Sequence, residues 1–311
     1  MIESMTHAPA QADARVGRDD HLTRFLLPEA GVRGVLVHLD ETWKQIRSRA
    51  DYPESIARLL GEASAASALF TGHAKVEGRL SVQLRGTGTL RTLFAECTAA
   101  GTLRGIAQLQ EDAPPPQGLA DLGPEPILAI TIENPSPHGR DPQRYQGLVP
   151  LVGDDLASAF EHYFVQSEQL PTRLLLAANG ERTAGLMLQK LPGDEGDADG
   201  WTRASALFDT LGQDELLAVP GPVLLHRLFH EEAPEVLAGK DLAFGCSCSR
   251  GRVEAMLQSL GREEAEAAVA DGHAHVRCEF CGQGYSFSGQ DIAGLFEPAA
   301  SEPMPAPDRL Q

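Results

Sequence analysis

Near its C-terminal end the sequence reads CSCSR at residues 246–250 and CEFC at residues 278–281. These stretches contain a C-x-C pair and a C-x-x-C pair, formed by Cys246, Cys248, Cys278 and Cys281. Each pair can supply two sulfur ligands from one tight turn, and a tetrahedral zinc site takes four sulfurs at about 2.3 Å. The pattern therefore predicts one Cys₄ zinc site that organises a small C-terminal domain.

The sequence around the cysteines predicts how this domain, residues 241–295, is built. Ser249 is a good N-cap for a helix that Gly261 would close. The inward positions of that helix are expected to be Val253, Met256, Leu257 and Leu260. The segment HVRCEFCGQGYSFS predicts a hairpin whose turn carries Cys278 and Cys281. So small a domain has a poor core and gains stability from metal.

Two histidines precede this hairpin turn. His273 and His275 could in principle replace a sulfur, but they are not paired with the turn as a ligand pair would be. We therefore expect four cysteine ligands and no histidine ligand.

The part before the cysteine domain is expected to be a core domain of residues 21–192. Alternating, β-rich stretches predict strands, and residues 75–109 read as an antiparallel meander. Residues 53–70 and 155–169 carry apolar side chains at helical spacing. The prediction is an α+β domain built on antiparallel sheet with packed helices.

A change of composition follows the core domain. Residues 193–200, which begin an expected linker over 193–240, are acidic and Gly-rich, and we expect them not to pack. Residues 201–232 have a helical pattern broken by Gly212, Pro220 and Pro222, and their helices are too short to be stable alone. Plain packing on another surface is the simpler interpretation of their apolar face. The alternative is a metastable segment that can detach.

Composition excludes several classes of protein. The 311-residue chain has a formal net charge of −18, which opposes binding to nucleic acid and to anionic membranes. No apolar run is long enough to span a membrane, and residues 1–20 lack the apolar centre of a secretory signal, so we expect a cytoplasmic protein with loose tails at 1–20 and 296–311. The fifth cysteine, Cys97, lies in an apolar stretch and is expected to be buried.

The cysteine spacing leaves an inert structural site and a redox switch as alternatives, and spacing alone favours the first. A helix N-terminus after Cys248, with Arg250, Arg252 and Arg277 nearby, would favour thiolates, which are the forms that oxidants attack. Disulfides Cys246–Cys248 and Cys278–Cys281 would consume all four ligands and eject the zinc. The loss of a structural zinc would unfold so small a domain.

Three further motifs, together with the cysteine pairs, give the chain a resemblance to a known family. They are RFLLPEAGVRGVLVHLDETW, HYFVQSEQLPTRL, LLHRLFHEE, and CSCSR with CEFC. Over residues 21 to about 292 the chain resembles the heat shock protein 33 family, the redox-regulated 33 kDa chaperones.

This resemblance implies a holdase chaperone that works without ATP and is not an enzyme. The reduced form would hold one Zn²⁺ on the four cysteines and be inactive. Oxidative stress would form the two disulfides, release zinc, and unfold the cysteine domain and a metastable linker from about Trp201 to Lys240. The active form would be a homodimer that binds unfolded client proteins.

Three other functions compete with this interpretation. A zinc-ribbon protein that binds nucleic acid or a protein partner is opposed, in the nucleic-acid case, by the negative charge. A thiol–disulfide oxidoreductase would carry its C-x-x-C in a thioredoxin-like βαβ unit, which is absent from this pattern. A purely structural zinc protein would not change client aggregation on oxidation.

Overall fold

The computed structural model describes residues 20–110, 114–136, 141–193 and 196–297. The chain divides into two compact units, one ending at Cys246 and one beginning at Ser247. Nearly all of the two expected tails lies outside the described residues. The segment expected to be a separate linker, residues 193–240, belongs to the first unit.

The first unit carries most of the secondary structure. Its strands are β1 (His21–Leu27), β2 (Val32–Leu39), β3 (Arg79–Arg85), β4 (Leu90–Thr98), β5 (Thr102–Leu109), β6 (Ile127–Asn134), β7 (Gln143–Val149), β8 (Thr172–Ala178), β9 (Thr183–Lys190), β10 (Glu235–Asp241) and β11 (Ala243–Phe244). Its helices are α1 (Glu41–Arg47), α2 (Glu54–His73), α3 (Leu156–Glu168), α4 (Gly200–Phe208), α5 (Gln213–Ala218) and α6 (Gly221–Phe229), with the short 3₁₀ turns η1 (Leu119–Leu122) and η3 (His230–Glu232).

Two sheets form the frame of the first unit, and the predicted α+β class is confirmed. One has the order β10-β1-β2-β9-β8, and the other has the order β11-β5-β4-β3-β6-β7. All neighbouring strands are antiparallel except β11, which runs parallel to β5. The predicted meander corresponds to β3, β4 and β5.

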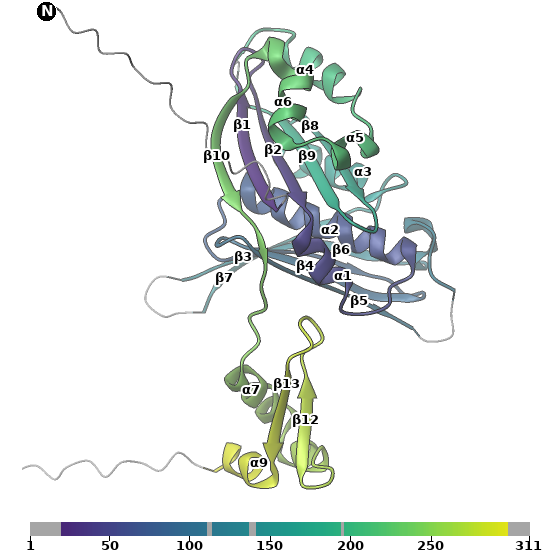
Figure 1. Ribbon diagram of the computed structural model, residues 1–311, viewed down its shortest axis with the longest axis vertical. Coiled ribbons are helices and arrows are strands. Elements are labelled where there is room, and N and C mark those ends of the chain that lie inside the picture. Colours follow the sequence, from purple (N-terminus) through teal and green to yellow (C-terminus); the bar gives the residue numbers. More distant parts are fainter. Residues whose placement is uncertain (1–19, 111–113, 137–140, 194–195, 298–311) are drawn as a thin grey trace, which may run out of the picture. The chain divides into compact units, whose positions relative to one another are not determined.

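Helix α2 lies between the two sheets (Figure 1). Its side chains from Ile56 to Phe70 are almost all buried, because a helix covered on two sides has no free face. Small residues allow this close packing: a side chain at Gly61 would lie 2.6 Å from the Cβ of Ala178. The many small residues of this helix thus allow close contact with both sheets.

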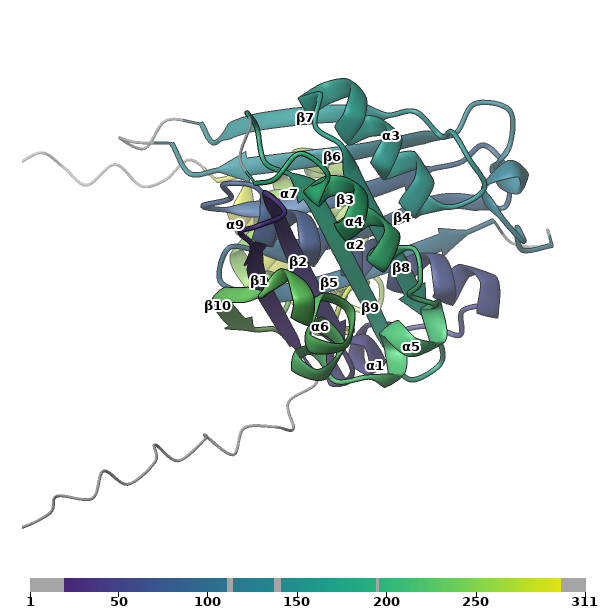
Figure 2. The same ribbon diagram turned by 90° about the horizontal axis from the view of Figure 1, so that it is seen from above.

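Helices α4, α5 and α6 cover the other face of the five-stranded sheet (Figure 2). The strand β9 is buried at seven of its eight positions because it is packed on both faces. Phe229 of α6 is fully buried, and its ring stacks on that of Phe25 of β1 with centroids 6.0 Å apart. The expected apolar face of residues 201–232 is therefore real, and it packs on the core sheet.

The acidic segment before α4 differs from the prediction that it would not pack. Gly196 approaches the turn between β1 and β2 so closely that a Cβ there would lie 2.3 Å from the backbone nitrogen of Gly31. Asp197 donates its backbone N–H to the Glu29 carbonyl at 2.8 Å. Arg203 of α4 neutralises this acidic stretch in part, with ion pairs to Asp197 at 2.9 Å and to other carboxylates. The acidic segment packs because Arg203 offsets part of its charge, and because Gly196 and Gly200 allow a close approach to the β1–β2 turn.

The last part of the expected helical linker is a strand. Residues 235–241 form β10, which adds to the free edge of β1. Six of its seven residues are exposed, including Val236 and Leu237. Its stability therefore comes from backbone hydrogen bonds to β1, which leave no clear pattern in the sequence.

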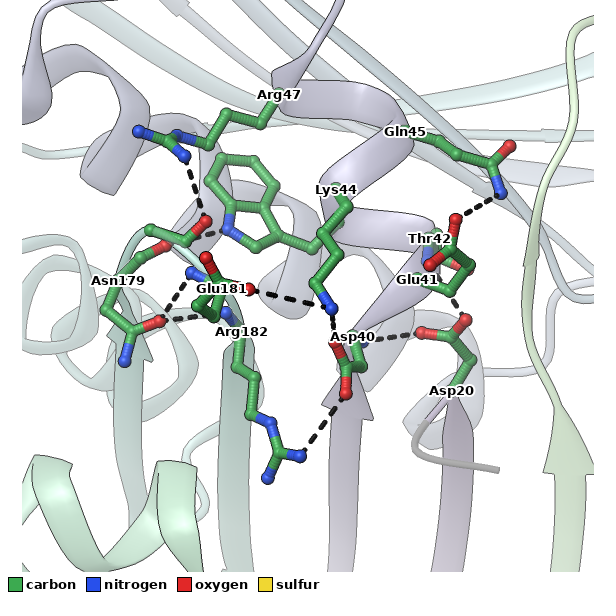
Figure 3. A network of polar contacts seen from close by, with 12 residues as sticks. Asp20, Asp40, Glu41, Thr42, Lys44, Gln45, Arg47, Asn179, Glu181 and Arg182 are labelled. Carbon is green, nitrogen blue, oxygen red and sulfur yellow. Dashed lines mark hydrogen bonds and ion pairs between the residues drawn. The ribbon is translucent and has the colours of Figure 1, made fainter. Parts of the chain in front are cut away.

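Helix α1 is fixed by a polar network that joins three segments of the first unit (Figure 3). Asp20 caps the helix from outside, accepting hydrogen bonds from the backbone N–H groups of Asp40 at 2.6 Å and Thr42 at 2.9 Å. The buried Trp43 donates its indole N–H to the Asn179 carbonyl at 2.8 Å. The N-terminus of α1 is therefore capped by a residue that lies outside the helix, Asp20.

The second unit is small. It contains the helices α7 (Arg250–Leu260), α8 (Arg262–Ala267) and α9 (Gly289–Leu295) and the hairpin strands β12 (His273–Arg277) and β13 (Gly284–Ser288). Its core has six buried residues: Val253, Leu257, Ala265, Ala274, Phe287 and Ile292. Met256 and Leu260, expected to face inward, are 39% and 51% exposed. No helix in the described parts of the chain has the length and apolar character needed to cross a membrane.

Candidate metal centre

The C-x-C pair lies in the segment that joins β11 to α7. The Ser249 side chain accepts a hydrogen bond from the backbone N–H of Arg252, which confirms the predicted cap of α7. The helix therefore begins directly after Cys248, and the boundary between the two units falls inside the C-x-C pair. Gly261 ends the helix, as predicted, with φ of 95°.

The C-x-x-C pair lies in the turn of the hairpin formed by β12 and β13, as predicted. Cys278 donates its backbone N–H to the Gln283 carbonyl at 2.9 Å, and Gly282 donates to the Cys278 carbonyl at 2.7 Å. Gly282 has φ of 74°, a left-handed conformation that favours glycine. The turn folds back on itself and brings Cys278 and Cys281 to one side.

The four predicted cysteines come together in space. Their sulfur atoms all lie within 4.8 Å of one another, and the Sγ atoms of Cys248 and Cys281 are 3.3 Å apart. None of the four forms a disulfide, and all have intermediate burial. Four sulfurs at zinc distance would be separated by about 3.8 Å, from tetrahedral geometry and a Zn–S bond of about 2.3 Å. The donor set and its spacing therefore fit a tetrahedral Cys₄ metal site.

The two histidines before the turn do not join this group. Within the described residues, the cysteine cluster is the only set of three or more potential ligands that lies close enough to hold a metal. His273 and His275 are exposed on β12 and stack on each other, with ring centroids 6.0 Å apart. That neither histidine is a metal ligand stays a prediction.

Tyr285 of β13 is a neighbour of the cluster that sequence reasoning did not identify. Its hydroxyl donates a hydrogen bond to the Cys248 sulfur at 3.1 Å. This hydrogen bond, followed by burial and by the charges of Cys248, Cys281 and Cys278, raises the pKa of Tyr285 to about 12. The hydroxyl is therefore a neutral donor at physiological pH.

Arg104 of β5 is a second unpredicted neighbour, and it belongs to the first unit. Strand β11 pairs with β5, and the next residue, Gly245, donates its backbone N–H to the Leu103 carbonyl at 2.9 Å. Cys246 therefore follows directly after the segment that pairs with β5. Burial by itself would lower the pKa of Arg104, but the Glu96 carboxylate and then the Cys246 side chain outweigh it and raise that pKa. Cys246 thus has a cation from the core sheet beside it.

Two of the arginines expected around the cysteines, Arg250 and Arg252, make contacts that hold the start of α7. Arg252 donates to the Ser247 hydroxyl at 2.6 Å, inside the C-x-C pair. Arg250 donates to the Ser286 carbonyl at 2.9 Å, and its guanidinium lies 4.2 Å from the ring centroid of Phe287. The Arg250 contacts attach the start of α7 to β13 and so help to bring the two cysteine pairs together.

The fifth cysteine is separate from the cluster. Cys97 of β4 is 1% exposed in the core of the first unit, as predicted. Burial is the main cause that raises the pKa of its thiol to about 12. A buried, protonated thiol is a poor nucleophile, so Cys97 serves as an internal control for the reactivity of the other four.

Comparison with known proteins gives a consistent result. The model of a family described as "Hsp33 protein" matches residues 20–288. The chain is 43% identical over 292 residues to a 33 kDa chaperonin of Ectopseudomonas mendocina, covering 91% of this chain and 97% of that protein. It is 42% identical over 285 residues to a 33 kDa chaperonin of Azotobacter vinelandii, covering 89% of this chain and 94% of that protein.

A solved structure has the same fold. The crystal structure of a 33 kDa chaperonin from Thermotoga maritima, described as a heat shock protein 33 homolog, aligns with a TM-score of 0.73 and 20% sequence identity. The alignment covers 89% of this chain and 97% of that one.

Proposed function

Because the chain belongs to the Hsp33 family, we propose that it is a redox-regulated holdase chaperone that works without ATP. In this proposal the reduced protein holds one Zn²⁺ and is inactive. Oxidation removes the metal, detaches apolar helices and allows the protein to bind unfolding chains. The observation that carries the proposal is the group of four cysteine sulfurs, none of them in a disulfide, within 4.8 Å of one another.

The residues that would hold the zinc are Cys246, Cys248, Cys278 and Cys281. When bound, the metal supplies structural stability and keeps the four sulfurs as thiolates. Structural zinc is worth about 10–16 kcal/mol in small finger peptides. A whole domain has a net stability of only about 5–15 kcal/mol, so a unit with six buried core residues depends on its metal.

Oxidation by hydrogen peroxide would convert the ligands into two disulfides, Cys246–Cys248 and Cys278–Cys281. A thiolate attacks one oxygen of the peroxide, the O–O bond breaks, and hydroxide leaves as a sulfenic acid forms. The neighbouring thiolate attacks that sulfur, the S–S bond forms, and a second hydroxide leaves. Two peroxide molecules thus consume four sulfurs, and no thiolate is left to hold the metal.

The chain provides a direct route from the cysteines to the apolar helices. Residues 200–229 form α4, α5 and α6, and η3, β10 and β11 then lead to Cys246. Helices this short are unstable without tertiary contacts. Once the second unit unfolds, we expect the linker from about Trp201 to Lys240 to detach from the five-stranded sheet.

Detachment would uncover an apolar surface on both partners of the contact. The sheet side includes Phe25, Leu36 and Leu186, and the helix side includes Leu224 and Phe229, all of them buried now. A large exposed apolar surface binds the apolar segments of unfolding proteins. This surface is our candidate for client binding.

Further parts of the proposal follow the family resemblance. The active form would be a homodimer, and the protein would bind neither nucleic acid nor membrane and would have no enzymatic turnover. A resting state in which the four cysteines are reduced and form no disulfide needs a reducing compartment, so we assign the protein to the cytoplasm.

Replacement of one ligand tests the proposal. We expect Cys278→Ser to weaken zinc affinity by more than about tenfold, since even an outer-shell partner of a metal ligand is worth that much. Peroxide should then no longer couple zinc release to suppression of client aggregation. Affinity is measured by competition with a chromophoric chelator.

The matched control is Cys97→Ala, which removes a thiol outside the cluster. It should keep one zinc per chain and normal activation. Unchanged zinc affinity in Cys278→Ser would refute the assigned ligand set. Tight RNA binding by the reduced protein would favour the zinc-ribbon alternative.

A further inference from the structure

The hydrogen bond from Tyr285 to Cys248 joins the two halves of the cysteine cluster. Cys248 belongs to the C-x-C pair, whereas Tyr285 lies on β13, the strand that follows the C-x-x-C turn. The O···S distance of 3.1 Å lies well within hydrogen-bond range for sulfur. Tyr285 is thus bonded to a ligand contributed by a different segment of the chain.

Two other contacts hold this geometry in place. Tyr285 pairs with Val276 across the hairpin and is half-buried against the core of the second unit, which fixes the ring. Arg250, two residues after Cys248, bonds to the carbonyl of Ser286 at 2.9 Å. The start of α7 is therefore held against β13, the strand that carries Tyr285. This arrangement keeps the Tyr285 hydroxyl within hydrogen-bond distance of the Cys248 sulfur.

We propose that Tyr285 is a positioning residue of the cysteine cluster, and that its hydroxyl slows the reaction of Cys248 with oxidants. The inference deepens the proposed redox function and rests on it for its consequence. A thiolate that accepts an O–H hydrogen bond has part of its lone-pair density engaged, so it is a weaker nucleophile toward peroxide. The same bond orients the sulfur toward Cys281, 3.3 Å away.

The chemical consequence concerns the first step of oxidation. In that step a sulfur lone pair forms the S–O bond, the O–O bond of hydrogen peroxide breaks, and hydroxide leaves. At Cys248 the attack must first break the Tyr285 hydrogen bond, and this adds to the barrier. Tyr285 therefore sets a threshold that separates basal peroxide from oxidative stress.

Tyr285→Phe tests the inference, because it keeps the ring and removes only the hydroxyl. We expect the variant to bind one metal per chain and to release zinc roughly three- to tenfold faster under the same peroxide concentration. This range is a fraction of the effect of a hydrogen bond to a charged group. Release is followed with a colorimetric zinc indicator.

A second readout needs no oxidation. In protein loaded with Co²⁺, loss of a hydrogen bond to the sulfur should shift the sulfur-to-cobalt charge-transfer absorption to longer wavelength. If Tyr285 acted only through the packing of its ring, the Tyr285→Phe variant would show the same charge-transfer absorption as the parent protein. The matched control is Tyr145→Phe, which removes the hydroxyl of an exposed tyrosine in the first unit and should change neither readout.

The outcomes distinguish this inference from the proposed function. Unchanged absorption together with an unchanged release rate would overturn the role of Tyr285. A shifted absorption with an unchanged rate would overturn its effect on oxidation, as would failure of the variant to hold one metal per chain. If the parent protein releases no zinc under peroxide, the proposed function fails, and the cobalt spectrum alone decides whether Tyr285 bonds to the ligand.

Discussion

The carboxyl group of Glu62 lies inside the first unit, on the helix α2 between the two sheets. The residue is only 7% exposed. Burial raises its pKa to about 7, against an opposing effect of Arg58, and the like charge of Asp155 adds to the rise. A buried carboxyl group without a dedicated cation disfavours the folded state once it ionises.

This group gives the folded protein a predictable pH dependence. In the unfolded chain the carboxyl ionises near pH 4.5, whereas in the folded chain it ionises near pH 7. The folded state therefore binds more protons between these values, and its stability falls as the pH rises from about 4.5 to about 7. Above that range the loss is complete and constant.

Glu62→Gln removes the ionisation. The free energy of unfolding of the variant relative to the parent should rise by about 2 kcal/mol between pH 5 and pH 8, because each unit of pKa shift is worth about 1.4 kcal/mol. Urea unfolding followed by tryptophan fluorescence measures this quantity. Both tryptophans, Trp43 and Trp201, report on the first unit.

The control for this prediction is Glu77→Gln, which removes an exposed carboxylate on the same unit. Exposed ion pairs contribute little to stability, so this variant should follow the parent at both pH values. A Glu62→Gln difference that is the same at pH 5 and pH 8 would show that the carboxyl group stays neutral or stays ionised throughout.

Single residues also show where sequence reasoning works and where it does not. The clustering of the four cysteines was predictable because short pairs constrain their own geometry: the turn that holds Cys278 also holds Cys281. For Tyr285, the sequence predicted only a place in the hairpin segment HVRCEFCGQGYSFS. Its hydroxyl meets Cys248 because β13 packs against the start of α7, and that contact is set by tertiary structure.

At the scale of elements, the contact of α6 with the five-stranded sheet carries the proposed switch. Phe229 is completely buried there and stacks on Phe25. Replacing a buried phenylalanine by alanine costs about 3–5 kcal/mol. Because α6 is short, much of that loss should appear as local detachment of the linker.

We therefore expect Phe229→Ala to bind an apolar fluorescent dye and to suppress client aggregation partly while still reduced and zinc-bound. Hydrogen exchange across residues 200–229 should be faster than in the parent protein. The control is Val223→Ala on the same helix, where the side chain is 45% exposed and little packing is lost. If the reduced Phe229→Ala protein stays silent in both assays, packing of α6 does not restrain activity.

The elements also divide into predictable and unpredictable ones. The apolar periodicity of residues 201–229 predicted α4, α5 and α6, because packed helices leave a one-sided pattern. The strand β10 left no such pattern, since its side chains are mostly exposed and its partner is a distant strand. The packing of Gly196 depends on the close approach of the β1–β2 turn, which composition does not encode.

For the molecule as a whole, the proposed switch depends on two units whose hydrophobic cores differ in size. The first has an extensive core around α2, whereas the second has six buried residues and a set of four sulfurs that fits a metal. The expected α+β class followed from alternating and helical patterns in the sequence. The two-sheet arrangement around α2 did not, because pairing between distant strands is not written in local periodicity.

In the proposed switch, the loss of metal, the loss of thiols and the gain of holdase activity occur together. One time course tests it: the reduced protein is treated with peroxide under mild heat while zinc release, free thiols and citrate synthase aggregation are followed in the same samples. We expect one zinc to be released per chain as four of the five thiols disappear, leaving Cys97, and aggregation to be suppressed with the same time dependence. Suppression of aggregation while zinc stays bound would contradict it.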